Sequence, residues 1–128
     1  MPARILVADT PEGDRRIAGI LAGYDVVFAR TLGAAQRALA DGGFSLALIG
    51  VHFDDSRMFD LLRTLQGSKV PVVCIRSHHF ASTSISIEGL QIATRALGCA
   101  LFLDLTWYAD DARGNDTVRK QLESLIPP

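Results

Sequence analysis

Lysine is scarce in this chain of 128 residues, because only Lys69 and Lys120 accompany eleven arginines. The formal net charge is −1, so no basic excess indicates nucleic-acid binding and no acidic tract indicates disorder. The two cysteines, Cys74 and Cys99, form no CxxC pair, and we expect buried thiols in a reducing compartment. No apolar run approaches the roughly 18 residues of a membrane span, and the first residues show no signal-peptide pattern. We therefore expect a soluble, cytoplasmic protein.

Short apolar segments alternate with amphipathic segments along the whole chain. The apolar segments predict strands at Arg4–Asp9, Asp25–Ala29, Leu46–Val51, Val70–Ile75 and Ala100–Leu103. The amphipathic segments predict helices from Thr10-Pro11 to about Ala22, from Thr31 to Gly42, and at about Asp55–Gln66, Ile87–Leu97 and Asn115–Ile126. Alternation of this kind predicts a single α/β domain, a flavodoxin-like doubly wound (βα)5 three-layer sandwich with a parallel five-stranded sheet in the order 2-1-3-4-5. Whether Pro127-Pro128 ends the domain or begins a linker stays open.

The third apolar segment indicates where a functional site is expected. It runs from Leu46 to Ile49, is too short for a buried helix, and reads as a strand covered on both faces. In open α/β sheets, ligands bind beyond the carboxyl ends of such strands. The residue at that place is Gly50, which carries no functional side chain. The loop that follows is polar and contains Asp54, Asp55 and Ser56.

Over nearly its whole length the chain resembles the receiver domain of two-component response regulators. The similar segments are RILVADTPEGDRRIAGILAGYDVVFA, FSLALIGVHFDDSRMFDLLRTLQ, VPVVCIRS and ALGCALFLDL, in the family's order and spacing. The resemblance implies a signalling module of bacterial two-component or phosphorelay systems, which is not an enzyme. The chain contains no DNA-binding helix-turn-helix and no catalytic unit, so we expect any output to pass through another chain.

The family's phosphorylation pocket has five hallmark positions. Two acids after the first strand hold Mg²⁺, an Asp ends the third strand, a Thr or Ser ends the fourth, and a Lys ends the fifth. This set suits phosphoryl transfer, because a hard cation neutralises charge while a carboxylate attacks in line. By the resemblance, this chain has at these positions Asp9, Thr10, Gly50, Arg76 and Leu105, with Thr106 where proline is usual. Only Asp9 matches, which implies a degenerate receiver, or pseudo-receiver, that binds neither metal nor cofactor.

A shifted register is the alternative explanation for these differences. Using Asp54 or Asp55 as the phosphoacceptor would pull the apolar run out of the sheet. Ser77 would serve as the switch hydroxyl after a slip of one residue. Neither lysine reaches the end of the fifth strand by a small slip, since Lys69 precedes the fourth strand and Lys120 lies inside the last helix.

Arg76 is a candidate replacement for the lost cation. Its guanidinium is expected to reach Asp9, or Asp54 and Asp55, because an isolated buried carboxylate is costly. If this internal pair forms, replacing Arg76 with alanine should destabilise the fold; the alternative is an arginine that points into solvent.

A small anionic ligand bound near Arg76 is the alternative function. The polar residues that would contribute to such a site are Ser77, His78, His79, Ser82, Thr83, Ser84 and Ser86. No glycine-rich phosphate motif supports it. A metal site at His78 and His79, joined by His52, is disfavoured because adjacent histidines diverge, so exposed loop histidines are expected. A hydrolase or transferase is disfavoured, because the sequence lacks a convincing pair of nucleophile and general base.

The segments from residue 85 to 108 are apolar on more than one side. The resemblance implies that this helix 4–strand 5–helix 5 face contacts another signalling protein, a kinase or an output protein, or a second copy of the chain. Aromatic residues often anchor such interfaces. The candidate surface comprises Ile87, Leu90, Arg95, Leu101, Trp107 and Tyr108. The alternative is that these residues belong to the core. No nucleic acid or membrane is expected as a partner.

Overall fold

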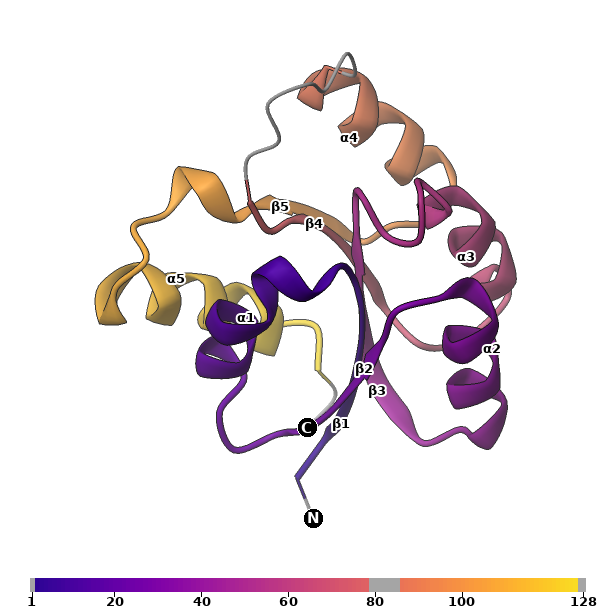
Figure 1. Cartoon of the computed structure of the whole chain (residues 1–128), viewed down its shortest axis with the longest axis horizontal. Coiled ribbons are helices and arrows are strands. Elements are labelled where there is room, and N and C mark those ends of the chain that lie inside the picture. The colour runs from indigo at the N-terminus through magenta and orange to yellow at the C-terminus, as the bar shows by residue number, and fades with distance from the viewer. Residues whose placement is uncertain (1, 79–85, 127–128) are drawn as a thin grey trace.

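The computed structural model of the protein describes residues 2–78 and 86–126. Five parallel strands form one sheet in the order β2-β1-β3-β4-β5, which confirms the predicted flavodoxin-like fold (Figure 1). The strands are β1 (Arg4–Ala8), β2 (Asp25–Ala29), β3 (Phe44–Gly50), β4 (Val72–Arg76) and β5 (Leu101–Asp104). The α-helices are α1 (Asp14–Ile20), α2 (Leu32–Asp41), α3 (Met58–Leu65), α4 (Ile87–Ala96) and α5 (Ala112–Glu123), and the short 3₁₀ helices are η1 (Pro11–Gly13) and η2 (Leu105–Trp107).

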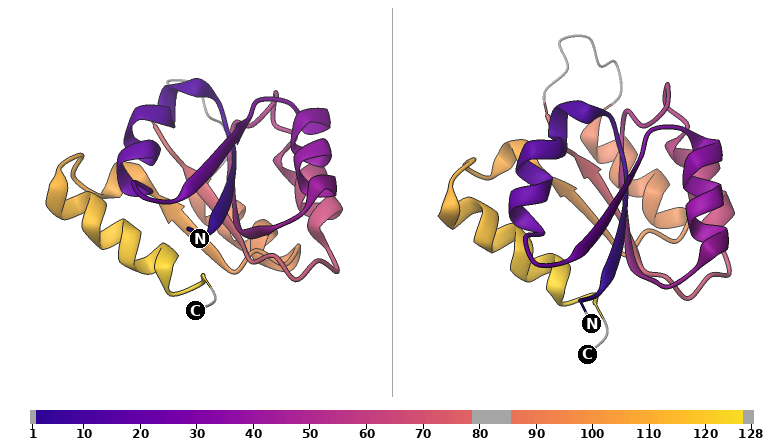
Figure 2. Two further views of the ribbon diagram at one scale, coloured as in Figure 1. Left: turned by 90° about the horizontal axis from the view of Figure 1, so that it is seen from below. Right: turned by 60° about the horizontal axis from the view of Figure 1, so that its bottom comes forward.

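The helices cover both faces of the sheet and produce two apolar layers. Helices α1 and α5 lie together on one face, and α2, α3 and α4 lie on the other (Figure 2). Because successive strand residues point to opposite faces, Leu6 and Ala8 pack under α2 and α3 while Ile5 and Val7 pack under α1 and α5. Both β1 and β3 are buried on two sides, which explains their continuous apolar sequences.

Several features expected from the sequence are present in the structure. The Thr31 hydroxyl accepts a hydrogen bond from the Ala34 N–H (3.1 Å) and caps α2. Cys74 and Cys99 are buried free thiols, as predicted. In the two described ranges, no helix is both long enough and apolar enough to cross a membrane.

Three helix starts differ from the prediction. Thr10 makes no side-chain cap, and a 3₁₀ turn precedes α1, which begins at Asp14. Helix α5 begins at Ala112, ahead of the predicted Asn115, because the Asp111 carboxylate accepts a hydrogen bond from the Gly114 N–H (2.8 Å). Helix α3 begins only at Met58, because the residues before it form a left-handed turn.

The left-handed turn between β3 and α3 contains no glycine. Asp54, Asp55 and Ser56 have φ values of 43°, 52° and 69°. This conformation costs roughly 1–2 kcal/mol per residue for L-amino acids other than glycine. The Asp54 carboxylate compensates by accepting a hydrogen bond from the Leu32 N–H (2.8 Å), which docks the turn onto the start of α2.

Replacing the exposed Ser56 with glycine should therefore stabilise the protein. The gain in unfolding free energy should be about 0.5–1 kcal/mol, because relief of the positive φ exceeds the added entropy of the unfolded chain. Urea denaturation measures it, and Ser56→Ala, which keeps the strained φ, is the matched control. The turn geometry would be contradicted if both variants gained the same unfolding free energy, or if neither variant gained any.

Candidate functional site at the carboxyl ends of the strands

The candidate site lies where the central strands end. Asp9 directly follows β1, Gly50 ends β3, Arg76 ends β4 and Asp104 ends β5. The registers place Arg76 beside Asp104 on neighbouring strands. Parallel strands bring their carboxyl ends to the same edge, so these four residues meet at the usual ligand-binding edge of this fold.

Asp9 occupies the space beside Gly50. A Cβ atom added at Gly50 would lie 1.9 Å from Asp9 Oδ1 and 2.3 Å from Asp9 Cγ. Asp9 is only 2% exposed, so its carboxylate has little freedom to withdraw. Any side chain at position 50 therefore competes with Asp9 for the same volume.

The Asp9 carboxyl group is held in a desolvated environment. Burial is the largest influence and raises the pKa of Asp9 above its ordinary value of 3.8. The Ser77 side chain and the Thr10 backbone oppose this shift, followed by the charges of His78 and Arg30. Burial prevails, so the charged form of Asp9 is disfavoured in the folded protein.

Asp9→Asn should stabilise the protein at neutral pH by about 1 kcal/mol, because it removes the cost of a buried charge. A raised folded-state pKa means that the folded protein binds more protons than the unfolded chain between the two pKa values. Stability due to Asp9 is thus greatest at low pH and falls as the pH rises through this window. The advantage of Asp9→Asn should shrink as the pH is lowered toward about 4.

Urea denaturation of both proteins across this pH range measures the difference. Asp41→Asn is the matched control, because Asp41 is exposed on α2 and loses the same charge. A destabilising effect of Asp9→Asn at neutral pH would show that the charged carboxylate is favoured in the fold.

Arg76 forms a buried ion pair with Asp104. Its Nη1 lies 3.0 Å from Asp104 Oδ2, and the two side chains are 15% and 0% exposed. The Asp104 carboxylate also accepts a hydrogen bond from the Thr106 N–H (3.0 Å). The predicted internal arginine pair is present, but the prediction named Asp9, Asp54 and Asp55 and did not consider Asp104. Asp54 instead bonds to the start of α2.

Leu105 does not face the site. It is 2% exposed and packs in the apolar layer under α1 and α5. The side chain at the end of β5 that reaches the site is that of Asp104, a residue that the sequence did not single out. The sequence could have indicated this pair only through the position of Asp104 opposite Arg76 on the neighbouring strand. That position depends on the register of β4 against β5, which the sequence does not display.

Polar residues from the β3–α3 and β4–α4 loops border the site. The Ser77 Oγ lies 2.8 Å from His78 Nδ1, and the rings of His52 and His78 are 6.3 Å apart. Both histidines are half-buried, which corrects the expectation of exposed loop histidines. Burial is the main cause that lowers the pKa of His52. His79, Ser82, Thr83 and Ser84 lie outside the described residues.

The described residues do not suit the Mg²⁺ ion of phosphorylated receivers. Mg²⁺ is bound through carboxylates and waters in near-octahedral geometry. Here the position beside Asp9 is Thr10, and Gly50 contributes no ligand. Within residues 2–78 and 86–126, no group of three His, Cys, Asp or Glu side chains is placed to hold a metal ion.

Arg16 fastens the loop after β5, a role that the sequence did not indicate. Its guanidinium donates hydrogen bonds to the carbonyls of Leu105 (2.7 Å), Tyr108 (2.9 Å) and Ala109 (2.9 Å), and to Asn115 Oδ1 (2.9 Å). Its side chain is only 10% exposed. Arg16 lies 89 to 93 residues before these carbonyls in the sequence, so no local sequence pattern indicates the contact.

The predicted interaction surface is divided between core and exterior. Leu90 is 4% exposed and belongs to the core under α4, which corrects its assignment to the surface. Ile87, Leu101 and Tyr108 are half-buried, and Arg95 is exposed. Trp107 is 65% exposed on η2. The surface therefore retains a large exposed aromatic residue but lacks its predicted leucine on α4.

Comparison with known proteins identifies the fold. No family model matches the sequence, and no protein of curated function matches it. The structure is similar to a response regulator from Thermotoga maritima (TM-score 0.74, 14% identity, 98% of each chain). It is also similar to the chemotaxis protein CheY4 of Vibrio cholerae (TM-score 0.72, 19% identity, 98% of this chain and 100% of that chain).

A third similar structure is NtrX from Brucella abortus, with a TM-score of 0.70 and 26% identity over 98% of this chain. The match spans only 28% of NtrX. The chain therefore has the fold of CheY-like response regulator receiver domains, and the predicted receiver resemblance is confirmed at the level of the fold.

Proposed function

We propose that this chain is a receiver-type signalling module that works without phosphorylation and acts through contacts with another protein. Receiver domains are signalling modules that bind other signalling proteins, and the fold supports this general role. The specific proposal concerns the pocket, which keeps the receiver architecture but not its phosphoryl chemistry.

The packing of Asp9 against Gly50 carries the proposal. A phosphoacceptor needs a carboxylate at the end of β3, with room for a phosphoryl group and a cation in front of it. Here the acceptor position is glycine, and the Asp9 carboxylate lies within 1.9 Å of where a Cβ atom would sit. The raised pKa of Asp9 further disfavours the charged carboxylate that a cation needs.

The Arg76–Asp104 ion pair gives this pocket an internal connection between β4 and β5. The resemblance implies that, in phosphorylated receivers, the Thr or Ser ending the fourth strand and the Lys ending the fifth both contact the phosphoryl group. The ion pair makes such a link from the chain's own side chains. It also neutralises Arg76, which weakens the alternative of a small-anion sensor at this arginine.

Amide NMR tests the proposal directly. The uniformly ¹⁵N-labelled protein is titrated with Mg²⁺ and then with Mg²⁺ plus beryllofluoride, a phosphoryl mimic. We expect no saturable shifts at Asp9, Gly50 or Arg76, and no mass increase after incubation with acetyl phosphate. A receiver domain that has all five hallmark residues is the positive control.

Saturable shifts at these residues, or a phosphorylated species, would overturn the proposal and make Asp54 and Asp55 the next residues to replace. Inorganic phosphate titrated without Mg²⁺ tests the anion-sensor alternative. Saturable shifts at Arg76 and Ser77 under that condition would favour the sensor.

A further inference from the structure

Two thiols from distant parts of the chain meet near the beginning of β5. Cys74 lies in the middle of β4, and Cys99 lies in the connection between α4 and β5. The side chains of the two residues are hydrogen-bonded to each other. The Ala100 N–H donates to the Val72 carbonyl (2.8 Å), which holds this connection against β4. Both cysteines are free thiols, so a single two-electron oxidation is enough to join them.

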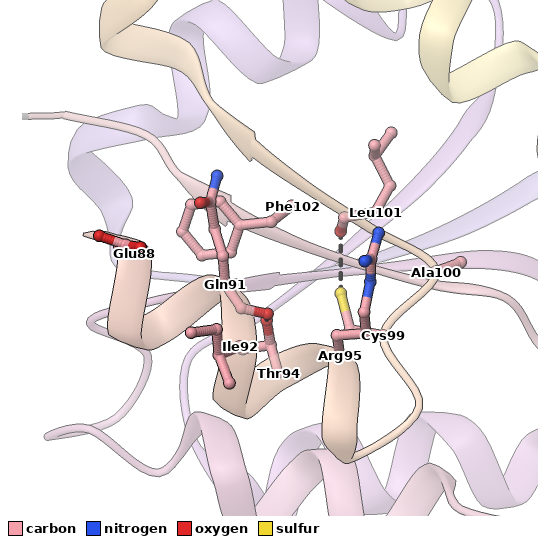
Figure 3. Close-up of a pocket in the computed structure, with 9 residues that line it drawn as sticks. All are labelled: Glu88, Gln91, Ile92, Thr94, Arg95, Cys99, Ala100, Leu101 and Phe102. Atoms are coloured by element: carbon pink, nitrogen blue, oxygen red, sulfur yellow. Dashed lines mark hydrogen bonds between the residues drawn. The ribbon is translucent and has the colours of Figure 1, made fainter. Parts of the chain in front are cut away.

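The two thiols differ in their access to solvent. Cys74 is 0% exposed, inside the apolar layer that α2, α3 and α4 cover. Cys99 is 8% exposed and lines a groove of about 460 Å³ between α4 and the segment 99–102 (Figure 3). There the Cys99 thiol donates a hydrogen bond to the Leu101 carbonyl (2.8 Å), which holds its sulfur beside β5. A small molecule that enters the groove therefore reaches Cys99 before Cys74.

The contact between the thiols also favours one of them as the nucleophile. The hydrogen bond with Cys74 is the largest influence on Cys99 and lowers the pKa of its thiol below the ordinary value, although burial opposes the shift. The same hydrogen bond, together with burial, raises the pKa of Cys74. The thiolate is the form of cysteine that attacks an oxidant. The cysteine that lines the groove is therefore also the more reactive one.

We propose that Cys99 and Cys74 form a reversible redox switch, which hydroperoxides oxidise to a disulfide within one chain. Cys99 is the attacking thiol and Cys74 is the resolving thiol. Cys99 precedes β5, whereas Arg76 and Asp104 end their strands at the opposite edge of the sheet. The switch is therefore separate from the candidate site at the carboxyl ends of the strands, and it does not depend on the proposed function.

The oxidation proceeds in two displacements. The Cys99 thiolate attacks one oxygen of the hydroperoxide, so that an S–O bond forms and the O–O bond breaks. The leaving oxygen takes a proton and departs as water, or as an alcohol from an organic hydroperoxide, and Cys99 becomes a sulfenic acid. The Cys74 sulfur then attacks the Cys99 sulfur; the S–S bond forms, and hydroxide leaves with the Cys74 proton as water. The two thiols lose two electrons and two protons, and the peroxide is reduced by the same two electrons.

The disulfide would change the connection between α4 and β5. A disulfide holds its sulfur atoms about 2.0 Å apart, so the hydrogen-bonded contact must shorten and draw this connection toward β4. Cys99 also loses the proton that it donates to the Leu101 carbonyl. The largest amide NMR shifts on oxidation should therefore lie where α4 ends and β5 begins, and dithiothreitol should reverse them.

Peptide mapping of the wild-type protein tests the disulfide. The reduced protein is exposed to a small excess of hydrogen peroxide, unfolded in acid, and treated with N-ethylmaleimide to mark the remaining thiols. Trypsin places the two cysteines on separate peptides, 70–76 and 96–113. The expected product is these two peptides joined, with a loss of about 2 Da and no alkylation of either cysteine. A non-reducing gel should show a single chain, because the two thiols meet within one molecule.

Two matched serine variants separate the attacking thiol from the resolving thiol. Cys74→Ser keeps a hydroxyl that can donate to Cys99 but cannot resolve it, so dimedone should trap a sulfenic acid at Cys99. Cys99→Ser leaves only the buried thiol, and its rate of reaction with peroxide should fall at least about tenfold. The same variant unfolded in urea is the control, and there Cys74 should react like an ordinary exposed thiol. Thermal melts check that both variants are folded.

Three outcomes would overturn the switch: joined peptides that are absent from the oxidised wild-type protein, disulfides that form only between chains, or a folded Cys99→Ser variant that reacts as fast as the wild type. Failure of dithiothreitol to restore both thiols would show that the oxidation is not reversible. None of these outcomes affects the beryllofluoride titration, so the proposed function stands or falls separately.

Discussion

Replacing Gly50 with alanine should lower the free energy of unfolding by about 2–3 kcal/mol, the upper part of the range for overpacking a filled core. The new methyl group would lie 1.9 Å from Asp9 Oδ1. Because Asp9 is buried between the ends of the strands, relief requires movement of the carboxylate or of the backbone. Urea denaturation of Gly50→Ala measures the loss.

A double-mutant cycle with Asp9→Ala identifies the cause. Removing the carboxylate leaves no approach closer than the 3.0 Å to the Asp9 Cβ atom, which a small shift relieves. The loss caused by Gly50→Ala should therefore be at least about 1 kcal/mol smaller in the Asp9→Ala background. Gly19→Ala is the control, because Gly19 lies in α1 and, apart from its chain neighbours and the adjacent helix backbone, no atom lies within 4 Å of its added Cβ. If Gly50→Ala were as stable as the wild type, Asp9 would have another position available, and the main support for the proposed function would disappear.

The second large effect is expected at Arg76. Arg76→Met should lower the free energy of unfolding by about 3–5 kcal/mol, because it leaves the Asp104 charge buried and unpaired. Methionine keeps much of the apolar volume of the arginine stem, so the loss reports the charge rather than a cavity. Thermal and urea denaturation measure it.

The matched control is Arg63→Met. Arg63 and Asp60 form an ion pair on α3 at 3.3 Å, but their side chains are 61% and 51% exposed, so the change should cost under about 0.5 kcal/mol. Asp104→Asn keeps an acceptor for the Thr106 N–H and removes the buried charge. The double variant Arg76→Met/Asp104→Asn should therefore be more stable than Arg76→Met alone. Equal losses for Arg76→Met and Arg63→Met would contradict a buried pair.

The pattern of apolar segments was enough to predict the fold. Continuous apolar runs such as the one ending at Gly50 belong to strands buried on both faces, and their alternation with helices leaves few possible topologies. Thr31 was predictable as a cap for a related reason, since a cap acts on residues only three positions away. In both cases the physical cause is local, and the sequence displays it.

The site was predictable only in part. The sequence predicted that glycine lies at the end of β3 and arginine at the end of β4, because the strand ends could be found. It did not show that Asp104 is the partner of Arg76, nor that Leu105 turns into the core, because both depend on the register of β4 against β5. Leu90 was misassigned for a similar reason, since an apolar helix residue is buried or exposed according to what packs on it.

The sequence by itself therefore determined the fold and placed Gly50 at the end of β3, because both follow from residue type and spacing along the chain. The tertiary structure decided which side chains surround Gly50 and Arg76. It put the Asp9 carboxylate against Gly50 and paired Arg76 with Asp104. It also brought the thiols of Cys74 and Cys99 into contact. These relations join residues far apart in the chain, and only the packing of strands and helices brings them together.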